Sequence, residues 1–370
     1  MIKRSLPQRI WHKYLHVKYI LCGGKRKYWN YVLGGVKLKP LSEEQRQEIK
    51  QYWKARTGKN VDTRWHQLLY SMNGVLNVRY LPFDIYPDII ANWIPSYKVK
   101  NFFDDKNLYR YLFKDFNIPT RHVECCNGVY YLPQLDGIEK SLEEVMAYCH
   151  NLEDCIIKPS KSSSSGNGII GFSIKNGVNK DGRTLEEVLK SYGKNFCIES
   201  KLQACDNLRA LNPSSCNTLR IHTFRSVKQK KVVFLSAYVR IGREGSVVDN
   251  ASKGGITCQV MNDGILGDFS SSVKPFKRLD STDSGIKLAG YKIDRFDEMV
   301  STAIRAHSVL PFFGIIGWDI TISNEGKVTI IEYNPDPDMR IEQLPFRDSC
   351  LMDYQDEILE EVYGIKVKKQ

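Results

Sequence analysis

Hydrophobic residues recur with a helical period in one stretch of this chain, and polar residues mark helix starts in three others. Between residues 296 and 307 apolar side chains return every three or four positions, which predicts a helix that begins after Asp294 and ends before Pro311. Capping boxes, in which Ser or Thr precedes Glu or Gln by three positions, predict helices that begin after Ser42, Ser141 and Thr184. Local pattern alone therefore places four helices.

Short apolar runs between these helices predict β-strands. The runs lie at residues 154–158, 169–174, 230–240, 317–322 and 327–333. Helices and hairpins follow one another irregularly and without an internal repeat, which favours an α+β protein with antiparallel sheets over a regular parallel βαβ array. We predict a boundary near residue 97, after a mostly helical and basic N-terminal extension at residues 1–97.

Length and composition indicate a soluble protein with two or three lobes. The 370 residues exceed one compact core, and 42% hydrophobic and 26% charged residues are typical of globular proteins. No apolar run reaches the roughly 18 residues that span a bilayer, and no secretory signal is apparent, so we expect a cytoplasmic protein. The ten cysteines include no C-x-x-C pair, so we expect reduced thiols, with Cys125 and Cys126 on opposite faces of a strand.

The charge balance favours an anionic partner. A net charge of +12 suits a nucleotide, an acidic glycan, lipid phosphate or nucleic acid. Residues 1–30 interleave basic and aromatic side chains, which suits peripheral contact with the anionic inner face of a membrane; a solvated helical face docked on the body is the alternative. His12 and His16 have the spacing of metal ligands on a helix, but no third ligand is nearby, so we expect a structural role.

The most informative stretch is GWDITISNEGKVTIIEYNP at residues 317–335, which predicts two strands joined by a Ser-Asn-Glu-Gly turn. We pair Ile322 with Lys327 across this turn. Asp319 then lies opposite Ile330. This register decides which side chains of the two strands share a face.

Because side chains alternate with period two along a strand, Glu332 and Asn334 then share the face of Asp319. Carboxylate and amide oxygens on rigid strands suit Mg²⁺, which takes one or two carboxylates together with substrate phosphates. An ordinary hairpin with a polar outer face is the alternative. Since clustered carboxylates repel each other without a cation, Glu332→Gln and Asp319→Asn are expected to change the stability of the fold little.

A second informative stretch is CIIKPSKSSSSGNGIIGFSI at residues 155–174, in which Lys158 ends an apolar strand and a Ser/Gly loop leads into the next. This is not a Walker loop. It nevertheless allows an ammonium group to touch phosphate while backbone N–H groups and hydroxyls fold over a triphosphate. We expect residues 159–168 to be mobile without nucleotide and to order over bound phosphates, and a plain hairpin connection is the alternative.

Seven sequence blocks follow one another between residues 98 and 335. They are VKNFFDDKNLYRYLFKDFNIPT, CIIKPSKSSSSGNG, FCIESKLQAC, NPSSCNTLRIHTFRS, NASKGGITCQV, GWDITI and IIEYNP. Together they resemble the ATP-grasp superfamily, and within it the subgroup associated with sugar transfer and bacterial surface-polysaccharide genes. The resemblance implies an α+β ATP-grasp fold in which two lobes clasp ATP. It implies a pre-ATP-grasp segment at 98–154, a small lobe with the Ser/Gly phosphate loop at 155–205 and a large lobe with the Mg²⁺ site at 206–370.

The resemblance also assigns a nucleotide site. The residues that it implies are Lys106, Lys158, Ser163, Ser164, Gly166, Gly168, Glu199, Lys201, Leu202 and Asp206. Lys106 and Lys158 would hold the ATP phosphates, with Lys158 also near the adenine edge. Residues 199–202 would meet the base. Asp206 would meet the ribose hydroxyls, where the family more usually has Glu.

At the reacting end, the resemblance implies Arg220 beside the phosphates or the acyl phosphate, where its planar guanidinium stabilises developing charge; Lys158 is the second catalytic residue. Asp319, Glu332 and Asn334 would carry one or two Mg²⁺ ions. The residues implied on the acceptor side are Asn250, Lys253, Gly254 and Gly255. A tight β-turn is the alternative for that last stretch.

These roles imply an ATP-dependent, ADP-forming ligase that activates a carboxylate as an acyl phosphate and couples it to an amine or a hydroxyl, decorating a glycan or glycan precursor with an amino acid. A kinase on the same scaffold that phosphorylates a sugar or similar acceptor is the alternative enzyme. A non-catalytic basic protein that binds membrane or nucleic acid is the third hypothesis, and the ordered nucleotide motifs argue against it. Neither His222 nor His307 is assigned as a general base.

Overall fold

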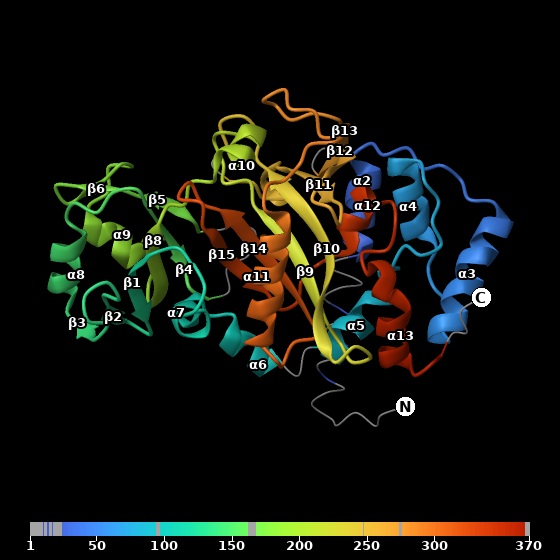
Figure 1. Ribbon diagram of the computed structural model, residues 1–370, viewed down its shortest axis with the longest axis horizontal. Helices are drawn as coiled ribbons and strands as arrows, with labels where there is room; N and C mark the ends of the chain where they lie inside the picture. The colour runs from blue at the N-terminus through green and yellow to red at the C-terminus, as the bar shows by residue number, and fades with distance from the viewer. Residues whose placement is uncertain are drawn as a thin grey trace.

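The computed structural model describes residues 10, 13, 14, 17, 24–93, 97–161, 168–246, 248–273 and 276–366. It consists of two lobes built on antiparallel sheets, with the N-terminal helices at the far end of the larger lobe (Figure 1). The predicted α+β class with a mostly helical N-terminal extension is confirmed. Part of what was expected from the sequence lies outside the described residues: Ser163, Ser164, Gly166, His12, His16 and much of residues 1–30.

The smaller lobe, green in Figure 1, is a six-stranded sheet of order β3-β2-β1-β8-β4-β5 that packs against two helices. Its strands are β1 (Arg121–Cys126), β2 (Val129–Tyr131), β3 (Glu139–Lys140), β4 (Cys155–Pro159), β5 (Ile170–Phe172) and β8 (Asn195–Ser200). Its helices are α8 (Leu142–Cys149) and α9 (Leu185–Ser191), and both begin at the predicted capping boxes. Because β1 pairs directly with β8, the sheet runs across the division expected at residue 154.

One predicted strand of this lobe is interrupted. The strand expected over residues 169–174 is divided into β5 and β6 (Ile174–Lys175). β5 pairs with β4, whereas β6 forms a separate hairpin with β7 (Val178–Asn179). The apolar run is therefore continuous in sequence, but its two halves satisfy their backbone groups with different partners.

The larger lobe is a seven-stranded antiparallel sheet of order β13-β12-β11-β10-β9-β14-β15. Its strands are β9 (Leu219–Ser226), β10 (Lys231–Ile241), β11 (Ile256–Val260), β12 (Leu266–Val273), β13 (Phe276–Leu279), β14 (Ile315–Ile322) and β15 (Val328–Asn334). The predicted helix α11 (Phe296–Ser308) packs on β9, β10 and β14, with its periodic apolar residues buried. Short elements α10 (Asp206–Leu211) and η3 (Ala251–Lys253) connect the strands.

The register predicted for the β14–β15 hairpin is wrong. Ile322 pairs with Val328 instead of Lys327, because Ser323 and Lys327 close the turn through a backbone hydrogen bond of 2.9 Å. A bulge follows, and Asp319 lies opposite Glu332 instead of Ile330. Directly opposite residues share a face, as do residues two apart, so the grouping of Asp319, Glu332 and Asn334 on one face is nevertheless confirmed.

The N-terminal helices cover the end of the large lobe and pack against the C-terminal ones. They are α2 (Arg26–Leu33), α3 (Glu43–Thr57), which begins at the predicted capping box of Ser42, α4 (Arg64–Asn73) and α5 (Tyr86–Trp93). The C-terminal partners are η4 (Arg340–Glu342), α12 (Gln343–Phe346), η5 (Met352–Tyr354) and α13 (Gln355–Tyr363). The elements α6 (Tyr97–Phe103), η2 (Lys106–Leu108) and α7 (Tyr109–Leu112) then lead into the small lobe.

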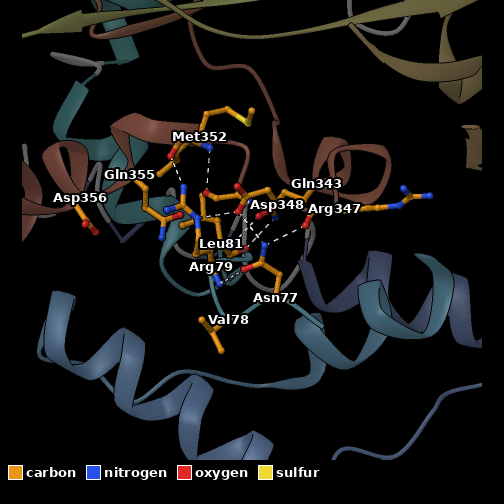
Figure 2. A network of polar contacts seen from close by, with 12 residues as sticks. Asn77, Val78, Arg79, Leu81, Gln343, Arg347, Asp348, Met352, Gln355 and Asp356 are labelled. Atoms are coloured by element: carbon orange, nitrogen blue, oxygen red, sulfur yellow. Dashed lines mark hydrogen bonds and ion pairs between the residues drawn. The ribbon is translucent and has the colours of Figure 1, made fainter. Parts of the chain in front are cut away.

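A polar network joins these two ends of the chain (Figure 2). The guanidinium of Arg79 donates to Asp348 Oδ1 at 2.9 Å and to the carbonyl of Met352 at 2.6 Å. Asn77 Nδ2 donates to the same Asp348 oxygen at 3.1 Å. Charge-assisted, partly buried hydrogen bonds of this kind tie the N-terminal helices to the large lobe.

The structure also tests the expectations about membrane-spanning segments and cysteines. In the part of the chain that is described, no helix is long and apolar enough to cross a membrane. The nine cysteines in that part are free thiols. Cys125 is buried while Cys126 is half-buried on β1, in agreement with their predicted positions on opposite faces of one strand.

Candidate functional site

A cavity of about 860 Å³ lies where the two lobes meet. Its wall is drawn from β4, β5 and β8 of the small lobe and from β9, β10, β14 and β15 of the large lobe. The charged side chains of this wall are of both signs. Among the described residues, six are basic and five acidic: Lys106, Lys158, Lys201, Arg209, Arg220 and Arg240, with Glu199, Asp249, Asp319, Glu332 and Asp338. Sites between lobes are a common location for small-molecule binding.

Two buried lysines approach the cavity from the small lobe. Lys158, near the end of β4, forms an ion pair with Glu199 of β8. Lys106, in η2, places its Nζ 3.1 Å from Glu332 Oε1 of β15. Burial acts to lower the pKa of Lys106, but the Glu332 carboxylate outweighs it and holds that pKa above its usual value. The Lys106 ammonium group therefore stays charged beside the cavity.

Two arginines of the large lobe share one carboxylate. Asp319 on β14 lies opposite Arg220 on β9, whose Nε and Nη2 donate to its two oxygens at 2.5 and 3.1 Å. Arg240 on β10 places its Nη2 2.9 Å from Asp319 Oδ2. Burial would raise the pKa of Asp319, but Arg220 and Arg240 together hold it below its usual range. The carboxylate is ionised and both guanidinium groups are oriented along the wall.

A further layer fixes Arg240. Its Nε and Nη2 donate to Thr218 Oγ1 at 3.0 and 2.6 Å. Asp249 Oδ2 in turn accepts from the backbone N–H and the hydroxyl of Thr218, both at 2.7 Å. Such connected, buried hydrogen bonds orient a side chain more firmly than one ion pair does.

The predicted metal ligands are brought together, with their charges already balanced. Asp319 is held by two arginines and Glu332 by Lys106. Among the described residues, no three His, Cys, Asp or Glu side chains gather as a metal site, so the predicted set depends on the Asn334 amide. Asn334 lines the cavity, and its buried Nδ2 has no hydrogen-bond partner among the described residues. Exchanging the two ends of the amide would put its oxygen in that unpaired position.

This donor set fits Mg²⁺ delivered with a polyphosphate. Glu332 and Asn334 offer hard oxygen atoms at the cavity wall, and Asp319 keeps lone pairs beyond those used by the arginines. Because neighbouring cations neutralise both carboxylates, the pocket favours an anion that brings its own Mg²⁺ over a bare cation.

The other end of the cavity is apolar around a short polar segment. Residues 199–204, which include Lys201 and Leu202, form one edge. The apolar residues that face the cavity near them are Pro119, Ile156, Ile169, Ile170 and Ile331. A flat aromatic ring beside backbone groups suits such a slot. The Glu199 carboxylate itself is engaged by Lys158.

The structure does not bring every predicted nucleotide residue to this cavity. Asp206 is not among the described residues that line it; its side chain is 91% exposed and pairs with Arg209, which does line it. Gly168 has a positive φ of 76° and is likewise not part of the described lining. Its carbonyl accepts a hydrogen bond from the Tyr192 hydroxyl at 2.7 Å.

On the predicted acceptor side, only Asn250 belongs to the described lining. Lys253 ends the short η3 helix, and Gly254 caps it in the left-handed conformation at φ 97°. A Cβ on Gly255 would come within 2.3 Å of the Asp249 carbonyl oxygen, so close backbone packing explains this glycine. The tight-turn interpretation therefore accounts for both glycines.

The two histidines considered for proton transfer are buried away from the described cavity wall. His307 hydrogen-bonds to Thr223 Oγ1 at 2.7 Å and to the Phe313 carbonyl at 2.9 Å, and burial lowers its pKa to about 4. Burial also lowers the pKa of His222 well below its usual value. Both belong to the neutral interior.

Sequence reasoning missed several residues of the wall. Arg240 and Asp249 lie outside the seven sequence blocks, Thr218 lies within one but was given no role, and Tyr238 has the pattern of an ordinary strand residue. Treating β9 and β10 as a paired hairpin could have identified residues of β10, because this pairing sets Tyr238 opposite Arg220. Asp338 was also missed, and the Lys27 ammonium of α2 lies 2.5 Å from its carboxylate, so the N-terminal extension reaches the wall.

Comparison with known proteins supplies a family. A family model described as sugar-transfer associated ATP-grasp matches residues 92–356. No curated protein matches the sequence.

Several solved structures are similar in fold. One is the biotin carboxylase domain of the Hydrogenobacter thermophilus 2-oxoglutarate carboxylase with MgADP, ADP and bicarbonate, at TM-score 0.43 and 12% identity over 75% of this chain and 49% of that one. Another is the Aspergillus clavatus N5-carboxyaminoimidazole synthase with ADP and its ribonucleotide, at TM-score 0.38 and 9% identity over 74% and 55%. The Enterococcus faecalis VanG D-Ala:D-Ser ligase matches at TM-score 0.37 and 12% identity over 71% and 62%. The chain thus spans about half of the first two, and at these low scores the similarities carry no argument about its activity.

Proposed function

Because this chain belongs to the sugar-transfer-associated ATP-grasp family, we propose that it is an ADP-forming ligase that uses MgATP to join a carboxylate to an amine or a hydroxyl. Its product would be a glycan or glycan precursor decorated with an amino acid. One observation carries the proposal: the buried cations Lys106, Lys158 and Arg240 and the partly buried Arg220 line one cavity, each beside a carboxylate, together with the Asn334 amide. That arrangement suits a polyanion that changes its charge distribution during transfer.

The small-lobe end of the cavity would hold the nucleotide. The apolar slot beside residues 199–204 suits adenine, and Lys106 and Lys158 are placed to bind phosphate oxygens as point charges. Glu332 and Asn334, with Asp319, would hold Mg²⁺, which supplies neutralisation and polarisation of the γ-phosphoryl group. Within the described part of the chain, Asp206 is exposed, so the ribose contact implied by the resemblance stays a prediction.

The large-lobe end would hold the reacting groups. Arg220 and Arg240 present planar guanidinium groups that match carboxylate and phosphate oxygens, and Asp319 keeps both in place. The donor carboxylate oxygen attacks the γ-phosphorus, the bond to the β-phosphate oxygen breaks and ADP leaves. The amine or hydroxyl then attacks the acyl carbon, loses its proton and releases phosphate. Positioning and cationic stabilisation provide most of the acceleration.

The experiment that tests this proposal separates the ligase from the kinase. The purified chain is incubated with MgATP and a panel of amino acids, uronic acids and sugar nucleotides, with and without hydroxylamine, and products are analysed by mass spectrometry. We expect ADP, phosphate and an amide or ester product, with a hydroxamate when hydroxylamine traps the acyl phosphate. Lys106→Met, which removes one phosphate-binding charge, is the negative control. A phosphorylated sugar without hydroxamate would instead establish the kinase.

A further inference from the structure

We propose that Arg121 is a positioning residue that fixes both phosphate-binding lysines, an inference that rests on the function proposed above. Arg121 begins β1 and is not among the described residues that line the cavity. Its side chain is only 4% exposed, and no sequence motif points to it. Its contacts nevertheless lead to both ammonium groups of the nucleotide site.

The first connection runs through a carboxylate. Arg121 Nη2 lies 3.4 Å from Glu199 Oε2, and the other oxygen of Glu199 forms the ion pair with Lys158. In the sheet, β8 lies between β1 and β4, so Glu199 is the natural bridge between the outer two strands. The guanidinium thus holds the carboxylate that holds Lys158.

The second connection runs through the backbone. The same Nη2 of Arg121 donates to the carbonyl oxygen of Lys106 at 3.1 Å. The N–H of Lys106 in turn donates to the Ser160 carbonyl, just after β4, at 2.8 Å. Arg121 therefore ties η2, which carries Lys106, to the strands that carry Glu199 and Lys158.

A second carboxylate, Glu124, lies near Arg121 without a hydrogen bond to its Nε. Arg121 Nε lies 3.9 Å from Glu124 Oε1, and Arg110 Nε lies 2.8 Å from the other oxygen of Glu124. The charges alternate along this chain from Lys158 to Arg110. Burial would lower the pKa of Arg121, but Cys197, Glu199 and Glu124 raise it above the usual value, so the cation persists in the interior.

The arrangement has a functional consequence. A lysine side chain loses about 2 kcal/mol of rotamer freedom when it is held in one place. If Arg121 and Glu199 restrict Lys158 and the backbone of Lys106 before the nucleotide arrives, less of that cost falls on phosphate binding. Arg121 would then affect the affinity for the polyphosphate and leave the affinity for the nucleoside unchanged.

The test compares two ligands in the full-length chain. The dissociation constants of Mg–AMP-PNP and of adenosine are measured by competition against a fluorescent nucleotide, for wild type, Arg121→Gln and Arg121→Lys. Arg110→Gln is the matched control, because Arg110 shares Glu124 but contacts neither Glu199 nor Lys106 in the described contacts. We expect Arg121→Gln to weaken Mg–AMP-PNP on the order of 10-fold or more, with adenosine unchanged and Arg110→Gln like wild type.

Arg121→Lys keeps a buried positive charge and so protects against simple loss of folding, which circular dichroism would detect. The lysine side chain is one bond shorter than that of arginine and has a single nitrogen, so it cannot keep both Nη2 contacts together with the Nε approach to Glu124. We therefore expect an intermediate loss of Mg–AMP-PNP affinity. The inference would be overturned if the folded variants bound Mg–AMP-PNP with wild-type affinity, or if their affinity for adenosine fell as much as their affinity for Mg–AMP-PNP. Either result would leave the proposed function unaffected. A wild-type protein that binds neither ligand would overturn both.

Discussion

Replacing Asp319 by asparagine removes a negative charge that two buried arginines share. The Asp319 side chain is 3% exposed, and its oxygens accept from Arg220 at 2.5 and 3.1 Å and lie 2.9 Å from Arg240. Asparagine keeps the size but offers one acceptor oxygen and no charge. At least one guanidinium then loses its charged partner while its side chain stays mostly buried at the cavity wall, and the two cations repel each other.

The size of the effect follows from burial. Removing one partner of a buried ion pair costs about 3–5 kcal/mol, because the remaining charge stays desolvated. Glu332→Gln should cost less, about 1 kcal/mol, because Glu332 is 28% exposed and glutamine still offers Lys106 an oxygen. With an unfolding entropy of about 2.1 cal/mol/K per residue, 370 residues give about 1.3 °C per kcal/mol. The unfolding temperature should therefore fall by roughly 4–7 °C for Asp319→Asn and by about 1 °C for Glu332→Gln. The sequence alone predicted little change for either, since it did not reveal the cations.

The assay is thermal unfolding of the nucleotide-free protein by calorimetry. Asp206→Asn makes the same exchange in an exposed pair and should leave the unfolding temperature nearly unchanged. Adding Arg240→Met to Asp319→Asn should recover part of the loss, with a coupling of about 0.5–3 kcal/mol. If Asp319→Asn unfolds at the wild-type temperature, this carboxylate does not hold the two arginines, and the reasoning about the reacting end fails.

Mg²⁺ alone should leave the unfolding temperature unchanged, whereas MgADP should raise it. The reason is that Arg220, Arg240 and Lys106 already neutralise the carboxylates of the predicted metal site. An increase in the unfolding temperature with Mg²⁺ alone would contradict this explanation. Burial lowers the pKa of His307 from 6.5 to about 4, so only the unfolded chain takes up this proton between those values. The free energy of unfolding, measured with urea, should therefore be highest above pH 6.5 and fall by up to about 3 kcal/mol towards pH 4. His307→Gln should show a weaker dependence on pH. An equally strong dependence in the variant would refute the idea that buried, neutral His307 causes it. Sedimentation with acidic liposomes at low salt should depend on residues 1–30, and unchanged binding after their deletion would favour the solvated-face alternative.

Local rules predicted the elements of this fold well. The capping boxes at Ser42, Ser141 and Thr184 begin helices in the structure, and the periodic residues after Asp294 form α11. The order of seven sequence blocks indicated the family that the family model matches over residues 92–356. Capping boxes and helical periodicity involve only a few neighbouring residues, and the sequence blocks keep a fixed order along the chain. All three can therefore be recognised without knowledge of the tertiary contacts.

The site itself was predicted only in part. The shared face of Asp319, Glu332 and Asn334 was foreseen, but from a register that the turn and a bulge displaced. The turn displaces the register by one residue and the bulge by one more. A one-residue displacement would have moved the β15 side chains to the other face, but a total of two restores the predicted face, which is why the grouping held.

The sequence by itself determined where four helices begin, where β4, β10, β14 and β15 lie, and which carboxylates of the last hairpin share a face. The tertiary structure decided what those carboxylates face. Arg220 and Asp319 are far apart along the chain and meet because β9 and β14 are neighbours in the sheet, just as β1 and β8 bring Arg121 to Glu199. Which strands become neighbours is settled by burying one common core, and a buried charge persists only where that packing places an opposite charge beside it.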